Sequence, residues 1–185
     1  MSETEALNAV EVLPYDPMWP ALFAAERIEL LKLGGAQIVE LEHIGSTGVP
    51  GLRAKPIIDI MAAVPTLAEG EALVARLGRR GYRLIETGMT DRLFLRRRSQ
   101  PDGQVFHLHI VTQSAWRHRH ERLMRDHLTR NPEVAQAYAE LKDRLAAAYA
   151  HDSIAYTRAK TGFVQGVIDE ARAELGLPAI GVWND

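Results

Sequence analysis

The stretch HIGSTGVPGLRAKPIIDIM, residues 43–61, decides the fold. Its first residues complete an apolar segment, 37–44, that has the pattern of a strand, and its isoleucine-rich end belongs to a second predicted strand, 56–64. The glycines and prolines between the two, residues 45–51, predict a connecting loop. Asp59 therefore lies on a buried strand that directly follows this loop.

The setting of Asp59 requires a partner for its charge. Isoleucine and methionine surround it in the sequence, and an ionised carboxylate left unpaired among apolar side chains is strongly unfavourable. A structural cation, such as Lys55 or an arginine, would compensate the charge. A metal ion, or a position that faces substrate at the mouth of the sheet, would serve equally well. The residues alone leave both explanations open.

The rest of the chain is expected to complete an α+β (α/β) protein, with a mixed sheet, an N-terminal helix and a C-terminal helical part. Beyond the two strands above, the predicted elements are helix 16–34 with Asp16 as its N-cap, helix 67–80, strands 82–86, 93–97 and 105–112, and helices 114–130, 132–150 and 153–175. We interpret residues 1–185 as one domain, with a core at about 12–173, a sheet at about 36–112 and helices at about 114–175. Residues 176–185 are expected to form a loose tail.

Composition excludes several classes of function. The 185 residues contain no cysteine, which excludes disulfides, thiolate zinc sites and a cysteine nucleophile, and suits a reducing, cytoplasmic compartment. A net charge of -2 gives no strong signal for nucleic acid. The longest apolar stretch, 56–65, contains an aspartate and is too short to cross a bilayer, so we expect a soluble protein without a membrane partner.

Gly45 and Ser46, followed by Asp59, form the strongest candidate site. A glycine lets backbone N–H groups approach a phosphate closely, and a carboxylate on the next strand can hold a divalent cation on that phosphate. A glycine-rich turn before a buried strand is also ordinary connection chemistry, so the spacing alone does not decide between the two.

His107 and His109 lie two residues apart on a predicted strand and therefore share one face. Neutral imidazoles bind zinc, manganese or iron, and they titrate near neutral pH, so the pair could serve metal binding or proton transfer. A polar strand face directed to solvent is the alternative. His43, which ends the strand before Gly45, is expected to face the same cavity.

The C-terminal half adds cations. Arg125 belongs to arginine clusters that could clamp phosphate or could be solvated faces. Tyr156 and Lys160 copy the Tyr-x-x-x-Lys spacing of short-chain dehydrogenases, but the chain lacks the Gly-x-Gly-x-x-Gly turn of a dinucleotide fold. We interpret the two residues as one helix face that packs on the core or reaches a phosphate.

Several uncommon segments recur together in an order that resembles the GrpB family, over about residues 12–173. These segments are YDPMW (15–19), HIGST (43–47), VPGL (49–52), AKPIIDI (54–60), HLH (107–109), RD (125–126) and YTRAK (156–160). The resemblance implies a nucleotidyltransferase-like fold of the polymerase-beta superfamily, in which Gly-Ser and the strand aspartate form the nucleotide corner. In some bacteria a similar domain is joined to dephospho-coenzyme A kinase, which implies nucleotide or coenzyme A metabolism.

One departure from the superfamily pattern concerns the metal centre. Active members carry a second carboxylate two residues after the first, where this chain has Met61. A third acidic position is matched by histidine, with His109 as the better candidate and His107 beside it. One aspartate with imidazoles suits manganese or zinc better than magnesium. Alternatively, Asp59 acts without a metal.

The expected function is nucleotidyl or phosphoryl transfer on a nucleotide or another phosphorylated small molecule. The alternatives are a catalytically silent nucleotide- or coenzyme A-binding module that assists another enzyme and, third, a metal-dependent phosphohydrolase. The predicted catalytic residues are Asp59, His109 and Ser46, and the predicted ligands of a divalent metal (manganese, zinc or magnesium) are Asp59, His107 and His109. The predicted substrate-binding residues are Gly45, Ser46, Thr47, Lys55, Arg125, Tyr156 and Lys160.

Overall fold

The computed structural model describes residues 10–182, and a five-stranded mixed sheet lies at its centre. The strands are β1 (Glu40–Ile44), β2 (Ile57–Val64), β3 (Arg83–Leu84), β4 (Arg92–Arg98) and β5 (Val105–Thr112). Their spatial order is β1-β2-β5-β4-β3, in which β2 and β5 are parallel and all other neighbours are antiparallel. The expected mixed α/β architecture is therefore confirmed.

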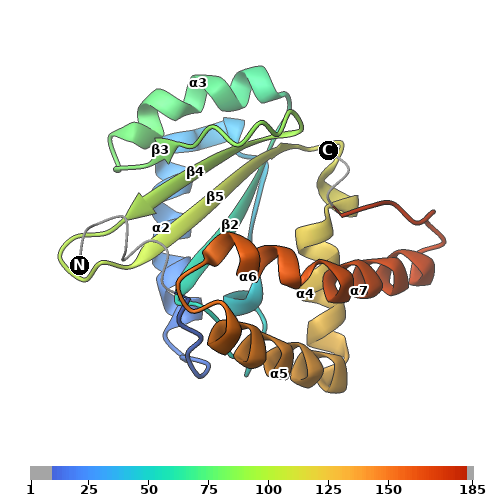
Figure 1. Cartoon of the computed structure of the whole chain (residues 1–185). Helices are drawn as coiled ribbons and strands as arrows, with labels where there is room; N and C mark the ends of the chain where they lie inside the picture. Colours follow the sequence, from blue (N-terminus) through green and yellow to red (C-terminus); the bar gives the residue numbers. More distant parts are fainter. Residues whose placement is uncertain (1–9, 183–185) are drawn as a thin grey trace.

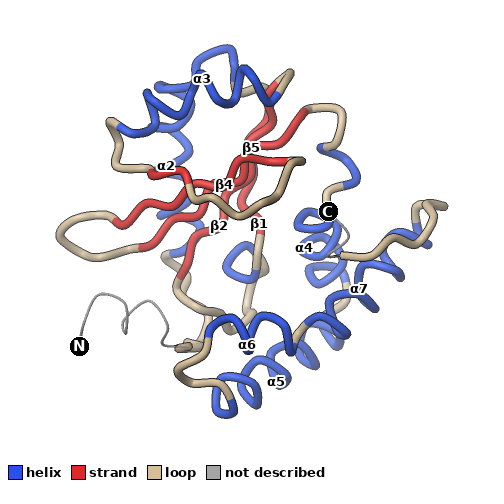
Figure 2. Tube along the Cα trace, turned by 45° about the horizontal axis from the view of Figure 1, so that its top comes forward, coloured by secondary structure: helices blue, strands red, loops and turns tan. Residues whose placement is uncertain are grey.

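Helices lie on both sides of the sheet (Figure 1). They are α2 (Trp19–Gly34), α3 (Leu67–Gly78), α4 (His120–Arg130), α5 (Pro132–Ala148), α6 (Ser153–Ala159) and α7 (Thr161–Glu174), with short 3-10 turns η1 (Gly35–Gln37), η2 (Ser46–Gly48) and η3 (Trp116–His118). The tube view shows α3 on one side of the sheet and α5, α6 and α7 on the other (Figure 2).

Strand alternation sorts the side chains of β2 onto the two faces. Ile58 and Ile60 are fully buried in the main core, which is shared with Leu30 of α2 and Leu73 of α3. Because successive strand residues point to opposite faces, Asp59 lies on the other face, toward the C-terminal helices. The face that carries Asp59 is therefore the one that the helical half can reach.

The N-terminus of α2 differs from the prediction. Met18, not Asp16, is the N-cap residue, so the expectation for Asp16 is wrong. The Asp16 side chain instead accepts a hydrogen bond from the Met18 N–H at 2.8 Å, in the turn before the helix. A short polar side chain that bonds the backbone two residues on favours a turn over a helix start.

Two predicted helices are interrupted. The helix expected at 114–130 begins only at His120, because Arg119 has an extended backbone and its guanidinium binds Asp91 and Glu121. The single helix expected at 153–175 is wrong as well, since α6 ends at Ala159 and α7 begins at Thr161. The chain between α6 and α7 consists of Lys160 alone.

The tail is partly ordered, contrary to the expectation for residues 176–185. Val182 is buried, and its N–H donates to the side chain of Gln165 at 2.9 Å. Arg172 donates to the Pro178 carbonyl at 2.7 Å. The segment 176–182 thus packs back on α7, and residues 183–185 lie outside the described chain.

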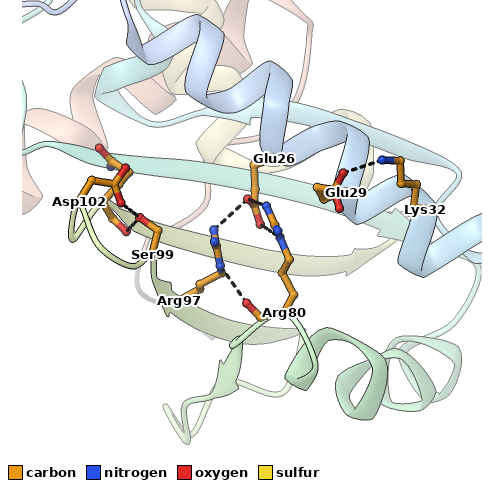
Figure 3. Close-up of polar contacts among 8 residues, drawn as sticks. Glu26, Glu29, Lys32, Arg80, Arg97, Ser99 and Asp102 are labelled. Atoms are coloured by element: carbon orange, nitrogen blue, oxygen red, sulfur yellow. Dashed lines mark hydrogen bonds and ion pairs between the residues drawn. The ribbon is translucent and has the colours of Figure 1, made fainter.

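A buried ion cluster joins the N-terminal helix to the sheet on the core side (Figure 3). Glu26 of α2 is 2% exposed and lies 2.9 Å from both the Arg80 and the Arg97 guanidinium. Arg97 also donates to the Arg80 carbonyl at 2.9 Å. The charge of Glu26 is therefore matched by two guanidinium groups, and one of these, that of Arg97, also binds a backbone carbonyl.

Within residues 10–182, no helix combines the length and the apolar character that a membrane crossing requires. The cytoplasmic location of the protein stays a prediction.

Candidate functional site

Asp59 and His107 form the centre of the candidate site. They are register neighbours on β2 and β5, and His107 Nδ1 lies 3.1 Å from Asp59 Oδ1. Burial favours the neutral acid, but the hydrogen bond and the charge of His107, with those of nearby imidazoles, leave the pKa of Asp59 below its usual value. An ionised carboxylate can only accept, so Nδ1 carries the hydrogen. The other ring nitrogen, Nε2, is not used by Asp59, so it can accept a proton when the ring of His107 is neutral.

Gly45 closes one side of Asp59. Its φ of +67° is in the left-handed region, and a Cβ placed on it would lie 2.4 Å from Asp59 Oδ2 and 2.9 Å from Asp59 Cβ. Glycine is therefore required both for the backbone conformation and for the close approach to the acid. The predicted loop and acid do come together, as the sequence indicates.

Thr47 and His43 support the loop from inside. The buried Thr47 hydroxyl donates to the Ile57 carbonyl at 2.8 Å and lies 3.0 Å from His43 Nε2. Burial lowers the pKa of His43 to about 4, so its neutral ring donates to Thr47. His43 stacks on Phe23 of α2, with ring centroids 4.8 Å apart. It thus lies on the core side of the sheet and not in the cavity where we expected it.

Ser46 meets the helical half at Tyr138 of α5. Burial raises the pKa of the Tyr138 phenol, and the nearby Ser46 side chain opposes that rise. Tyr138 is buried, and its ring stacks on Phe163 of α7 with centroids 5.1 Å apart. The glycine loop therefore lies close to the C-terminal helices at this serine.

Two lysines line the other side of the site. Lys55 Nζ lies 5.4 Å from the centroid of the Tyr156 ring, and Lys160 Nζ lies 4.3 Å from the same centroid. Asp59 acts electrostatically on both amines. Tyr156 and Lys160 are four residues apart and Lys160 keeps a helical backbone conformation, so the two side chains share one helix face, as the sequence indicates.

Other predicted site residues are used differently. Arg125 forms ion pairs with Glu42 and Asp126 and donates to the His43 carbonyl at 2.8 Å, so its charge is already matched. His109 packs on Phe94 with centroids 4.9 Å apart, and its Nδ1 is buried without a hydrogen-bond partner.

The environment of His109 also separates it from the dyad. Burial lowers its pKa to about 4. The imidazole in direct contact with Asp59 is that of His107. His109 lies on the same face of β5 two residues later, opposite Met61 of β2.

The donor set does not form a closed metal cage. In the part of the chain that the structure describes, 10–182, no group of three or more His, Asp or Glu side chains is arranged to hold a metal ion. Met61, at the position of the expected second carboxylate, is fully buried in an apolar cluster with Ile44 and Trp116. Metal binding by Asp59, His107 and His109 stays a prediction.

The sequence interpretation missed Lys142 and its contact with the buried Tyr138. Lys142 is 2% exposed, its amine binds the Arg53 carbonyl, and it lies 4.6 Å from the centroid of the Tyr138 ring. Residues at i and i+4 share a helix face, so a lysine four positions after a core tyrosine was the available signal.

Fold and site define a mixed α/β protein with a carboxylate–imidazole pair beside a glycine loop and two lysines. The model of the family described as GrpB protein matches residues 9–170, so the chain belongs to the GrpB family. A UPF0157 protein of Pseudomonas aeruginosa is 40% identical over 177 residues, which are 94% of this chain and 72% of that protein.

A solved structure gives the same assignment. The crystal structure of conserved protein GrpB from Enterococcus faecalis is 31% identical with a TM-score of 0.81, over 90% of this chain and 99% of that one. A terminal uridylyl transferase 4 from Trypanosoma brucei is a distant match, 15% identical with a TM-score of 0.47, over 85% of this chain and 55% of that one, and carries no argument about activity.

One relative has a different name. A dephospho-CoA kinase of Mycolicibacterium paratuberculosis is 39% identical over 82 residues, which are 42% of this chain and 20% of that protein.

Proposed function

We propose that the protein binds a nucleotide or another phosphorylated small molecule beside Asp59 and transfers its nucleotidyl or phosphoryl group to an acceptor. The observation that carries the proposal is the pairing of ionised Asp59 with His107 on one side of the Gly45 loop, next to the amines of Lys55 and Lys160. Transfer of a phosphorus-containing group to a hydroxyl acceptor is favoured by a base that takes the hydroxyl proton and by cations that offset the phosphate charge, and both lie together here.

The roles follow from the contacts. Asp59 accepts the Nδ1 hydrogen of His107 and orients the ring, so that Nε2 can accept the proton of an attacking hydroxyl group. The hydroxyl oxygen bonds to phosphorus while the phosphoanhydride P–O bond of the nucleotide breaks. Pyrophosphate leaves in nucleotidyl transfer, and the nucleoside diphosphate leaves in transfer of the terminal phosphoryl group. Gly45 carries no side chain, so the loop backbone can lie directly against the acid. Lys55 and Lys160 offset the negative charge of the phosphate groups.

A second candidate function is a catalytically silent binding module that assists another enzyme. Met61 favours it, because a buried thioether replaces the second carboxylate of the expected metal centre. The 82-residue similarity to a protein named dephospho-CoA kinase suggests coenzyme A precursors among the ligands to be tried.

Turnover and binding assays separate the two functions. We expect the wild-type protein to bind a nucleoside triphosphate and to convert it when a hydroxyl acceptor is supplied. His107→Gln should keep the binding and lower turnover by about 100-fold or more, the size of a general-base contribution. Binding without any turnover across acceptors would favour the silent module. Equal turnover by His107→Gln and wild type would refute the role given to the dyad.

A further inference from the structure

The amines of Lys55 and Lys160 converge from different parts of the chain. Lys55 precedes β2, whereas Lys160 joins α6 to α7, yet both amines lie over the ring of Tyr156. Tyr156 itself is buried, so the ring is a fixed support for the two cations. A ring face attracts cations, but it does not neutralise their charge.

Neither amine has an acidic partner in direct contact. Across the described residues 10–182, Lys55 and Lys160 form no ion pair with a carboxylate, and Asp59, the acid that acts on both, is bonded to His107 instead. Burial and the charge of Lys55 lower the pKa of Lys160 to about 8, which shows that the folded protein holds this charge at a disadvantage.

A third amine lies deeper in the same region. Lys142 donates to the Arg53 carbonyl, while the guanidinium of Arg53 pairs with Asp143. Burial, and then the charge of Lys160, lowers the pKa of Lys142 to about 7. Lys55, Lys160 and Lys142 therefore form a cluster in which neighbouring amines repel each other. We call this cluster the lysine wall.

We infer that the lysine wall is a subsite for two or more phosphate groups in series, and that it binds them without a divalent cation. The inference rests on the proposed function and specifies its substrate class, a nucleoside diphosphate or triphosphate or another diphosphate compound. The lysines supply the positive charge that metal ions supply elsewhere, and Met61 removes a carboxylate that a metal would need. Asp59 repels the phosphates from its own side, so they lie toward Lys55 and Lys160.

The length of the ligand follows from the number of charges. One phosphate dianion would be neutralised by Lys55 and Lys160 alone, which leaves Lys142 uncompensated behind them. A second and third phosphate group bring further negative charge within range of the same amines. A magnesium ion carried in on the phosphates would be repelled by the ammonium groups of Lys55 and Lys160. Magnesium is therefore expected to weaken binding.

Calorimetric titration with inorganic phosphate, pyrophosphate and tripolyphosphate tests this. The full chain is titrated at pH 7.5, first with a chelator and then with excess Mg²⁺. We expect tripolyphosphate to bind at least about tenfold more tightly than phosphate, since each further phosphate group adds charge-assisted hydrogen bonds. Mg²⁺ should leave this affinity unchanged or reduce it.

Lys160→Met is the test variant and Arg158→Met its control. Both remove one positive charge from the same part of the chain, but Arg158 is exposed and outside the site. We expect Lys160→Met to lose about tenfold or more in tripolyphosphate affinity and Arg158→Met to lose at most about twofold, because an exposed charge acts through screened solvent. Circular dichroism of both variants checks that they are folded.

The outcomes separate this inference from the proposed function. If nucleoside triphosphate binds only with Mg²⁺, and Lys160→Met binds it as well as wild type does, the metal-free subsite is refuted while the proposed function stands. If neither nucleotide nor tripolyphosphate binds in either condition, both are refuted. If tripolyphosphate binds as expected but no nucleotide is converted, the subsite stands and the transfer reaction fails.

Discussion

Two charged clusters lie on opposite faces of the sheet and differ in how their charges are matched. On the core face, one acid, Glu26, is held by Arg80 and Arg97, and every contact of the cluster is made within the protein. On the other face, the lysine wall gathers three amines around two tyrosines, and the nearby acid Asp59 is bonded to His107.

This difference distinguishes a structural role from a binding role. A buried charge whose partners are all present stabilises one packing arrangement, and loss of a partner is strongly unfavourable. A group of like charges without partners destabilises the free protein, and it is stabilised when a ligand of opposite charge arrives. The Glu26 cluster is therefore expected to determine stability, and the lysine wall to determine ligand binding.

The largest expected effect is on the Glu26 cluster. Glu26→Gln leaves two guanidinium groups without their acid, and removal of one member of a buried ion pair costs about 3 kcal/mol or more. Urea denaturation should show this loss of unfolding free energy, with the affinity for tripolyphosphate unchanged. Glu29→Gln, in the exposed pair with Lys32, is the control and should leave stability as it is. A Glu26→Gln protein as stable as wild type would contradict the structural role.

A smaller effect is expected at Gly45. Gly45→Ala forces a side chain into a left-handed conformation and against Asp59, at a cost of roughly 1–3 kcal/mol, and it should abolish ligand binding. Gly51→Ala is the matched control, because Gly51 also has a positive φ, +78°, but open space where the Cβ would lie. Thermal unfolding of both variants separates the two causes, because both carry the backbone strain but only Gly45→Ala also places a Cβ against Asp59. Equal ligand binding by the two variants would show that the approach of Gly45 to Asp59 has no role in the site.

The smallest effect is a pH dependence, and it has opposite signs for stability and for binding. The pKa of Lys160 is lowered to about 8 by burial and by Lys55, with Asp59 acting against them and Lys142 and Tyr156 packed nearby. Above pH 8 the folded protein releases this proton while the unfolded chain keeps it, so stability should rise between about pH 8 and pH 10.

A bound anion favours the charged amine, so affinity for tripolyphosphate should fall over the same range. Denaturation and titration at several pH values measure both trends. Affinity that is constant from pH 7 to pH 10 would exclude Lys160 from the site.

Much of the fold can be predicted from residue patterns. Strand 105–112 has the predicted limits, because alternating apolar residues and β-branched ends define it locally. Strand 82–86 is reduced to Arg83–Leu84, and the two helix breaks were missed. These errors arise where tertiary contacts decide, as when Arg119 leaves the helical conformation and binds Asp91.

The glycine loop and the aspartate of the candidate site could be predicted from the sequence, whereas its imidazole contact and its buried lysine could not. Gly45 follows β1, and Ile44 at the end of β1 pairs with Asp59 of β2, so their approach follows from one antiparallel strand pairing. Which imidazole contacts Asp59 depends on the register of β2 against β5, which local sequence does not specify. Lys142 enters from a distant helix, α5, and only the folded structure brings it close enough to interact with Lys160.

The unfolding free energy of Lys160→Met in the absence of any anion is the most direct measurement of the central claim. If the lysine wall is a set of unpaired charges, removal of one should leave the protein as stable as wild type or more stable, by up to about 1 kcal/mol at pH 7.5. Wild type should regain the difference when tripolyphosphate is added, and the variant should not respond. A loss of more than about 1 kcal/mol without ligand would mean that Lys160 is a structural cation, as Arg80 and Arg97 are, and would contradict the account.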